Sequence, residues 1–264
     1  MAGAHSQGWQ GWDDYAPFYD WENARTLGRR DVSFWTRVAS EARGRVLELG
    51  CGTGRISLPL IRAGVPLVGI DRSGPMLAHA ARRAAALKHR RRARRPRLRL
   101  IRGDIRALPF PRSTFGMVLA PYGVLQSLLR DRDLAAALES AHEVLAPGGV
   151  LGLDLVPDVP QWKEYTDRVQ LRGRGPRGSH FTLIESVRQD PRRRLTTFIQ
   201  EYRVRKGRTI TTHSFTLTFR TVPVRTMARR LASAGFRVKA VLGDYRGRPW
   251  DERADVWIIL AEKV

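Results

Sequence analysis

The chain has 264 residues, of which 42% are hydrophobic, enough to build the core of one elaborated α/β domain. Its 47 basic and 25 acidic residues leave a formal net charge of +22, which favours anionic partners but does not set the fold. The single cysteine, Cys51, excludes a disulfide framework, and no stretch approaches the roughly 18 apolar residues of a membrane span. Because the N-terminus has no apolar signal segment either, we expect a soluble cytoplasmic protein.

Up to residue 156, the sequence alternates between helical and extended patterns. Aromatic residues at helix-like spacing predict two helical pieces over 12–43. Ser73 suits the N-cap of a later helix. This alternation predicts βαβ units and a parallel sheet with helices on both faces. The expected strands are 46–49, 67–70, 98–101, 115–120 and 150–156, with helices at 54–63, from 73 onward and at 131–145.

The end of the helix after Ser73 is strongly basic. Residues 88–99, KHRRRARRPRLR, contain eight Lys or Arg and no acidic residue. Ligands of open α/β sheets bind beyond the carboxyl ends of the strands, and this run precedes a strand. We therefore expect a solvated helix end or a docking patch that points away from the chemistry.

After Pro157 the pattern changes to period-two alternation, which predicts an antiparallel insertion. Its strands are expected at 180–188, 195–205 and 209–220, with turns between them. A helix at 224–234 and strands at 236–242 and 255–261 then resume the earlier pattern. The expected parts are an N-terminal helical cap (1–44), a Rossmann-like core (45–156), the antiparallel insertion (157–222), and a C-terminal helix and strands that complete the core (223–264).

The most informative stretch is VLELGCGTGRISLPL, residues 46–60. A buried strand is followed by Gly50, Gly52 and Gly54, a turn that brings backbone N–H groups close to a ligand at a helix N-terminus. Asp71 ends the next strand, where a carboxylate can accept hydrogen bonds from both ribose hydroxyls. Asp104 follows the third strand, where it can accept from an adenine amino group.

The glycine spacing separates two cofactors. Dinucleotide folds require G-x-G-x-x-G, which Arg55 interrupts here. Gly-x-Gly-x-Gly preceded by Glu48 instead resembles the first motif of class I S-adenosylmethionine-dependent methyltransferases, in particular the small-molecule branch with domains of the 25/11 type. The resemblance covers most of the chain. That family's later motifs are matched, in order, by Asp71, Gly103-Asp104-Ile105 and Leu145-Ala146-Pro147-Gly148-Gly149.

The resemblance implies a seven-stranded α/β sheet with an antiparallel last strand, S-adenosylmethionine as cofactor and no metal. It places Glu48 and the glycine backbone near the amino-acid end of the cofactor. In the small-molecule branch an N-terminal tyrosine often closes over the methionine moiety. Tyr15 and Tyr19 match that place, with ordinary core packing as the alternative. The expected cofactor-binding residues are Tyr15, Tyr19, Glu48, Gly50, Cys51, Gly52, Gly54, Asp71, Arg72, Met76, Asp104, Ile105 and Ala120.

A methyl group on a sulfonium is already activated, so the protein has to place a nucleophile in line and exclude water. A general base is needed only if the acceptor must lose a proton. The sequence contains no convincing catalytic constellation. Three regions are expected around the acceptor, and their candidate catalytic residues are Tyr122 in the loop 120–126, His213 in the insertion and Tyr245 in the loop 243–250. A histidine on an apolar face is more often a core residue.

We expect N- or O-methylation of a small molecule, because the insertion resembles that of glycine and amino-sugar N-methyltransferases and no RNA-binding module is attached. Inward-facing arginines in the insertion would favour an anionic acceptor. An RNA or DNA methyltransferase is less favoured, since the loop 120–126 lacks the Asn/Asp-Pro-Pro-Tyr motif and the basic run has no aromatic for base stacking. A non-catalytic cofactor-binding protein is a further alternative. The oligomeric state stays open between monomer and homodimer.

Overall fold

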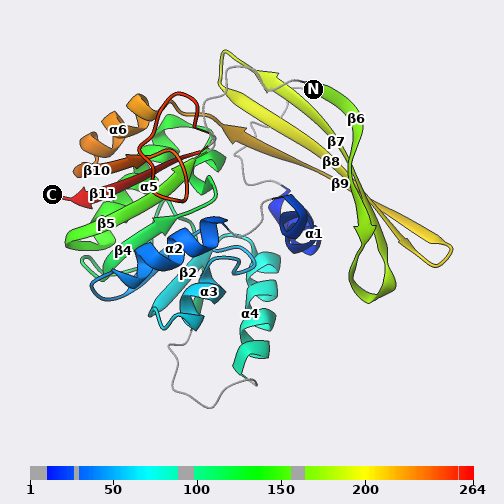
Figure 1. The fold of residues 1–264 in the computed structure, drawn as a ribbon, viewed down its shortest axis with the longest axis horizontal. Coiled ribbons are helices and arrows are strands. Elements are labelled where there is room, and N and C mark those ends of the chain that lie inside the picture. Colours follow the sequence, from blue (N-terminus) through cyan, green and yellow to red (C-terminus); the bar gives the residue numbers. More distant parts are fainter. Residues whose placement is uncertain (1–10, 27–29, 89–97, 156–163, 255) are drawn as a thin grey trace.

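Two β-sheets organise the chain in the computed structural model (Figure 1). The larger sheet has seven strands in the order β10-β11-β5-β4-β1-β2-β3. Strands β1 to β5 run parallel to one another, whereas β11 is antiparallel to both of its neighbours, β5 and β10. This confirms the expected Rossmann-like sheet with an antiparallel last strand. Its strands are β1 (Val46–Leu49), β2 (Leu67–Asp71), β3 (Arg99–Arg102), β4 (Phe115–Ala120), β5 (Leu145–Leu155), β10 (Phe236–Leu242) and β11 (Trp257–Lys263). The structure describes residues 11–26, 30–88, 98–155, 164–254 and 256–264.

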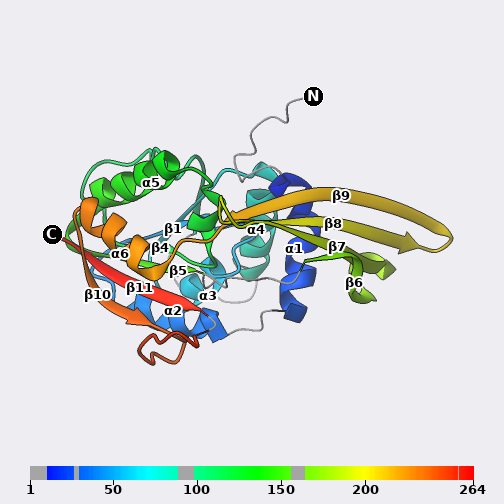
Figure 2. The same ribbon diagram turned by 90° about the horizontal axis from the view of Figure 1, so that it is seen from above.

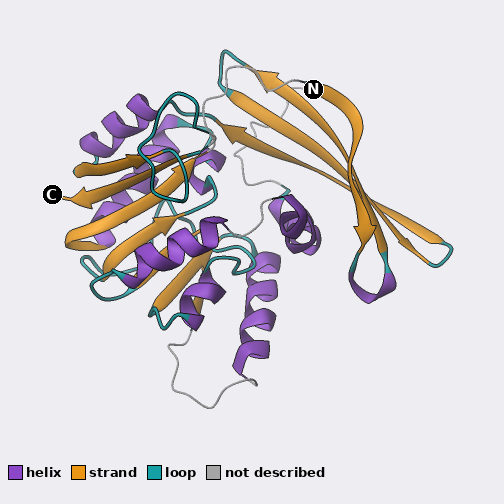
Figure 3. Ribbon diagram, in the orientation of Figure 1, coloured by secondary structure: helices purple, strands orange, loops and turns teal. Residues whose placement is uncertain are grey.

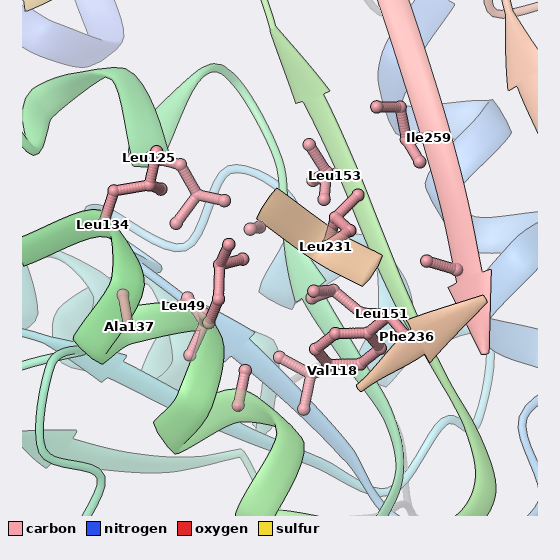
Figure 4. Close-up of a cluster of buried hydrophobic side chains, with 14 of the residues drawn as sticks. Leu49, Val118, Leu125, Leu134, Ala137, Leu151, Leu153, Leu231, Phe236 and Ile259 are labelled. Atoms are coloured by element: carbon pink, nitrogen blue, oxygen red, sulfur yellow. The ribbon is translucent and has the colours of Figure 1, made fainter. Parts of the chain in front are cut away.

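Helices cover both faces of this sheet, because successive residues of a buried strand point to opposite sides. In β4, Met117 and Leu119 join a core cluster with two helices, α2 and α3. Val118 and Ala120 join the cluster on the other face, with α5 and α6, which Figure 4 shows. The central strands β1 and β4 therefore need apolar residues at nearly every position. The helices are α2 (Arg30–Ser40), α3 (Ser57–Arg62), α4 (Gly74–Lys88), α5 (Asp131–Val144) and α6 (Val224–Ser233), with a short 3-10 turn, η1 (Val124–Ser127), after β4.

The second sheet is the antiparallel insertion, in the order β6-β7-β8-β9. The helix α1 (Trp12–Thr26) lies between the two sheets (Figures 1 and 2). Its aromatic face packs on the inserted sheet, where Phe18 stacks on Tyr202 with ring centroids 4.0 Å apart. The strands are β6 (Tyr165–Arg174), β7 (His180–Asp190), β8 (Leu195–Lys206) and β9 (Thr209–Arg220).

Three local features differ from expectation. The sequence predicted three strands in the insertion and the structure has four, because β6 contains two register shifts that break its alternation. Helix α3 begins at Ser57 rather than 54, since the glycine turn continues to Ile56. Strand β5 already pairs at Leu145, and Pro147-Gly148-Gly149 bulges out before pairing resumes at Val150.

Ser73 acts as predicted, because its Oγ accepts a hydrogen bond from the Met76 N–H (3.2 Å) at the start of α4. The basic run lies mostly at residues 89–97, outside the described residues. Among the described helices, none has the length and apolar character needed to cross a bilayer.

Candidate active site

A cavity of about 310 Å³ lies at the carboxyl ends of β1 to β4, bordered by α1 and the end of β9. Ligands of open α/β sheets bind at this edge, and the volume suits a small molecule. Most of the predicted cofactor-binding residues therefore come together in one place. Those that line the cavity are Tyr19, Glu48, Gly50, Cys51, Gly52, Asp71, Arg72, Met76, Asp104 and Ile105.

Three predicted cofactor-binding residues lie outside the cavity wall. Tyr15 is buried against the inserted sheet and donates its hydroxyl proton to Glu22 Oε2 (2.9 Å). A Cβ on Gly54 would meet the side chains of Leu58 and Ala80, so this glycine faces the core. Ala120 is fully buried on the α5 and α6 side of the sheet.

The glycine turn requires glycine for two reasons. Gly50, Gly52 and Gly54 have φ values of 60°, 52° and 78°, in the left-handed region that favours glycine. A Cβ on Gly50 would also lie only 2.3 Å from Cγ2 of Val124 in η1. Around Gly52, by contrast, such a Cβ would meet only the Gly50 carbonyl oxygen, at 3.9 Å. The turn thus leaves open space beside its backbone on the cavity side.

Asp71 fastens this turn to the next strand. Its Oδ2 accepts the N–H of Gly52 (2.7 Å) and its Oδ1 accepts the N–H of Ser73 (2.8 Å). Burial raises the pKa of Asp71, and these backbone hydrogen bonds oppose the rise. Each carboxylate oxygen keeps a lone pair for a ligand in the cavity.

Glu48 is the most deeply buried carboxyl group of the cavity wall. It is 2% exposed and accepts a hydrogen bond from the Ser57 hydroxyl. Burial raises its pKa to about 8, so that a cationic group nearby would favour its ionised form.

Asp104 is held by arginines. Arg106 donates from Nε to Oδ1 (3.0 Å) and from Nη2 to Oδ2 (2.7 Å), and its Nη1 reaches Asp133 Oδ1 (2.9 Å). Arg72 approaches Oδ2 at 3.4 Å. The Arg106 hydrogen bonds lower the pKa of Asp104 and keep it ionised. Asp104 can therefore still accept a hydrogen bond from a ligand, although Arg106 already occupies part of both carboxylate oxygens.

Arg55 forms the wall of the cavity nearest to α2. Its Nη1 and Nη2 donate to Oδ1 (3.0 Å) and Oδ2 (2.5 Å) of Asp31, a bidentate ion pair. Its guanidinium lies 4.9 Å from the ring centroid of Tyr122. The positive charge of the same guanidinium lowers the pKa of Tyr19, although burial dominates and raises that pKa to about 12. Arg55 thus joins two aromatic side chains of the cavity.

The backbone of the loop after β4 is strained. Tyr122 and Gly123 have φ values of 60° and 63°, and for Tyr122 this conformation is unfavourable. Asp154, in β5, accepts the Gly123 N–H at Oδ1 (2.9 Å). Its Oδ2 accepts hydrogen bonds from Trp35 Nε1 (3.1 Å) and the Tyr245 hydroxyl (2.9 Å). This buried carboxyl group therefore holds the strained loop in place.

Of the three catalytic candidates, only Tyr122 lines the cavity. Tyr122 is 38% exposed. His213 is exposed on β9, with its ring centroid 5.3 Å from that of Phe18, and does not border the cavity. Tyr245 supports the loop through Asp154 from outside the cavity.

Several residues of the wall were not expected from the sequence. Trp12 of α1 and Phe219 of β9, which lie far apart in the sequence, meet there with ring centroids 6.1 Å apart. Arg55 was considered only as an interruption of the dinucleotide pattern. Its place beside the glycine turn was a usable signal, whereas no local pattern marks Trp12 or Phe219.

The comparisons with known proteins agree with this geometry. Residues 46–149 match a family profile described as a methyltransferase domain. The demethylmenaquinone methyltransferase of Thermus thermophilus is 34% identical over 195 residues, which cover 67% of this chain and 83% of that protein. The chain belongs to the class I S-adenosylmethionine-dependent methyltransferases. A second relative of this chain is a cypemycin N-terminal methyltransferase of a Streptomyces species. The two are 27% identical over 231 residues, which cover 87% of each chain.

Two solved structures share the fold of the methyltransferase. A methyltransferase from Clostridium acetobutylicum aligns with a TM-score of 0.77 at 16% identity, over 96% of this chain and 98% of that one. An amino pentose methyltransferase from Micromonospora echinaspora, solved with S-adenosylmethionine, aligns with a TM-score of 0.68 at 22% identity, over 94% and 96%. At such identities the likeness concerns the fold alone.

Proposed function

We propose that the enzyme methylates a nitrogen or oxygen atom of an uncharged small molecule held at the aromatic end of the cavity. The observation that carries this proposal is the wall itself. Trp12 and Tyr19 of α1, Tyr122 after β4 and Phe219 of β9 all border the cavity beside the glycine turn. Aromatic walls exclude water and bind apolar or aromatic molecules. The relative from Thermus thermophilus, whose name gives a quinone precursor as its substrate, supports this class of acceptor.

We further propose that the same cavity binds S-adenosylmethionine. We assign Glu48 and the Gly50 and Gly52 backbone to its amino-acid end, Asp71 to the ribose and Asp104 to the adenine amino group. When bound, the cofactor would supply an electrophilic methyl group on a sulfonium, for transfer to a lone pair of the acceptor. Tyr15, Gly54 and Ala120 are left out of this assignment, because they lie outside the cavity wall. The remaining assigned residues are Tyr19, Cys51, Arg72, Met76 and Ile105.

The distribution of arginines favours an uncharged acceptor over an anionic one. Of the residues in the inserted sheet, only Phe219 borders the cavity. Three of the four arginines that border it are already paired with carboxylates: Arg55 with Asp31, and Arg72 and Arg106 with Asp104. The fourth, Arg102, lies at the carboxyl end of β3, on the side assigned to the adenine, and donates its Nε to the Arg72 carbonyl oxygen (3.2 Å). A carboxylate or phosphate acceptor at the aromatic end would therefore meet mainly neutralised cations.

Tyr122 is assigned to positioning the acceptor rather than to removing a proton. A tyrosine hydroxyl has a pKa of about 10, so it stays protonated and is not an effective base near neutral pH. An amine acceptor would have to arrive in its neutral form and lose its proton to solvent after transfer. The cytoplasmic location and the choice between monomer and homodimer remain predictions.

Labelled methyl transfer tests the proposal. The enzyme is incubated with radiolabelled S-adenosylmethionine and a cell extract, which is then separated into metabolites, protein and nucleic acid. We expect the label among the metabolites, and a Tyr122→Ala variant that still binds the cofactor should transfer less. Label only in the nucleic acid would support the less favoured RNA or DNA methyltransferase. Label only in protein would point to a peptide acceptor, in line with the cypemycin relative. Cofactor binding without any transfer would support the non-catalytic alternative.

A further inference from the structure

The inserted sheet has two edges, and they are built differently. β6 forms one edge and β9 the other. An unprotected sheet edge offers backbone N–H and C=O groups to another strand, and proteins usually block such edges with charges, bulges or proline. β6 is blocked in this way. It has two register shifts, a left-handed residue at Asp167 (φ 49°), and charged side chains at Asp167, Arg168, Arg172 and Arg174.

The outer half of β9 has none of these protections. Residues 209–214, with the sequence TITTHS, carry neither a formal charge nor proline, and their pairing with β8 shows no register shift. All six residues are exposed on both faces of the sheet, and Ile210 is 62% exposed. Four of the six are β-branched, a composition that favours pairing as a strand. Figures 2 and 3 show this hairpin projecting away from the main sheet.

The register identifies the backbone groups that face outward. A two-residue turn at 207–208 closes the β8–β9 hairpin, so Lys206 and Thr209 form a hydrogen-bonded pair. Alternation then directs the N–H and C=O groups of Ile210, Thr212 and Ser214 to the free edge. Thr216 has the same parity, and its carbonyl oxygen lies beside Gly11, where a Cβ would approach it to 2.5 Å. The inner part of the edge is thus covered by the start of α1, whereas the outer part has no strand partner among the described residues.

The surroundings of this edge are cationic. The next strand and its turn carry Arg203, Arg205, Lys206 and Arg208, all exposed. The only acidic residue in 200–212 is Glu201, which pairs with Arg203. The register places Arg203 directly beside Thr212 and Arg205 beside Ile210, on the same face of the sheet. A strand added to β9 would therefore have its side chains within reach of two arginines.

We propose that the β9 edge from Thr209 to Ser214 is a docking site for an extended acidic peptide, which adds a strand to the inserted sheet. Backbone hydrogen bonds supply the pairing, and carboxylates at alternate positions lie next to Arg203 and Arg205. The first ten residues of this chain contain no acidic side chain and do not match that charge. β8 and β9 expose no Phe, Tyr or Trp side chain for base stacking, which disfavours single-stranded nucleic acid. The proposal does not depend on which acceptor is methylated.

Fluorescence anisotropy with a labelled peptide of alternating Glu and Val tests the proposal on the full chain. Thr212→Pro removes one outward N–H without breaking a bond to β8, and we expect about tenfold weaker binding, the loss of roughly one hydrogen bond with some steric conflict. Thr212→Val keeps the N–H and should bind like the wild type. Arg205→Gln with Arg208→Gln should weaken binding, while Arg192→Gln with Arg193→Gln, at the opposite turn, should not. All four variants should bind S-adenosylmethionine with wild-type affinity, which checks that they are folded.

Hydrogen exchange of the wild-type protein gives a second measurement that needs no variant. The peptide should slow exchange within residues 209–214, and a Lys-Val peptide should not. Equal binding of the peptide by the Pro and Val variants would overturn strand addition. If an oligonucleotide binds more strongly than the peptide and Thr212→Pro does not weaken it, the basic surface attracts polyanions in general and the edge is not a strand-addition site. A dimer that Thr212→Pro dissociates, without peptide binding, would assign the edge to a second copy of the chain.

Discussion

Arg55 illustrates how one side chain organises the cavity. It follows the glycine turn in sequence, yet its partner Asp31 comes from α2 and the ring beneath it from the loop after β4. A planar guanidinium can satisfy both contacts at once, which a lysine ammonium cannot. The cavity therefore depends on arginine at this position rather than on positive charge alone.

For Arg55→Lys we predict S-adenosylmethionine binding weakened by about tenfold, because the bidentate ion pair and the contact with Tyr122 together contribute roughly 1–2 kcal/mol. Isothermal titration calorimetry measures this. Arg62→Lys, an exposed substitution on α3, serves as the control and should leave the affinity unchanged. Equal affinities for both variants would show that Arg55 has no part in forming the site.

Asp154 makes stability depend on pH in a defined direction. Burial raises its pKa from 3.8 to about 6, so ionisation costs the folded state more than the unfolded state. Protonated Asp154 therefore makes its full contribution to folding stability below pH 3.8, the ordinary pKa of the group. This contribution is lost as the pH rises through about 6, the pKa in the folded state. The difference between the two pKa values corresponds to about 3 kcal/mol.

Denaturant unfolding of the wild type and Asp154→Asn checks this effect. The amide does not titrate, so the wild-type advantage in unfolding free energy should fall by up to about 3 kcal/mol between about pH 4 and about pH 7. Other groups, such as Glu48, affect both proteins and cancel in the difference. A constant difference across this range would mean that Asp154 titrates normally.

At the scale of elements, the position of α1 depends on the inserted sheet. Glu22 Oε2 accepts hydrogen bonds from the hydroxyls of Tyr15 and Tyr202, which joins α1 to β8. Burial raises the pKa of Glu22, and both hydrogen bonds oppose this by favouring the ionised form. Since α1 also carries Trp12 and Tyr19, the insertion contributes to the cavity from a distance.

Tyr202→Phe should therefore lower stability and cofactor affinity together. We expect a loss of about 1–3 kcal/mol in unfolding free energy, the value of a hydrogen bond to a charged group, and several-fold weaker S-adenosylmethionine binding. Thr197→Val removes a hydrogen bond to Thr218 on the same sheet, away from α1, and serves as the control. It should affect stability without affecting affinity. A Tyr202→Phe variant with full affinity would separate the insertion from the site.

Most elements could be predicted because their signals are local. The expected strands 115–120 and 236–242 coincide with β4 and β10, since β4 is a short buried apolar run and β10 alternates apolar and polar residues as an edge strand does. β6 could not be predicted in this way. Its two register shifts remove the alternation, and it becomes a strand only because β7 offers backbone partners. The division of the chain into four parts stays a prediction.

At the scale of the whole molecule, the net charge of +22 does not indicate the substrate. The described ends that flank residues 89–97 are the end of α4 and the start of β3. The cavity borders the opposite ends of these elements, at Ser73 just before α4, at Met76 in its first turn and at Arg102 of β3. The most basic segment is thus attached far from the proposed chemistry.

Replacing the arginines of this segment should leave cofactor affinity within about twofold of the wild type, since exposed charges beyond a Debye length of about 10 Å are largely screened. Calorimetric titration at physiological salt measures it. A loss of tenfold or more would mean that the run approaches the cavity. The variant replaces Arg90, Arg91, Arg92, Arg94 and Arg95 with Gln.

The amino-acid sequence by itself determined the fold class, the cofactor and the glycine turn. These depend on local requirements: left-handed backbone at Gly50 and Gly52, and a carboxylate at the end of a strand. Only the tertiary structure decided that Arg55 meets Asp31, that Trp12 meets Phe219, and that the outer part of β9 has no strand partner among the described residues. The physical reason is that these contacts join segments far apart in the chain, whose meeting depends on how helices and sheets pack and not on any local pattern.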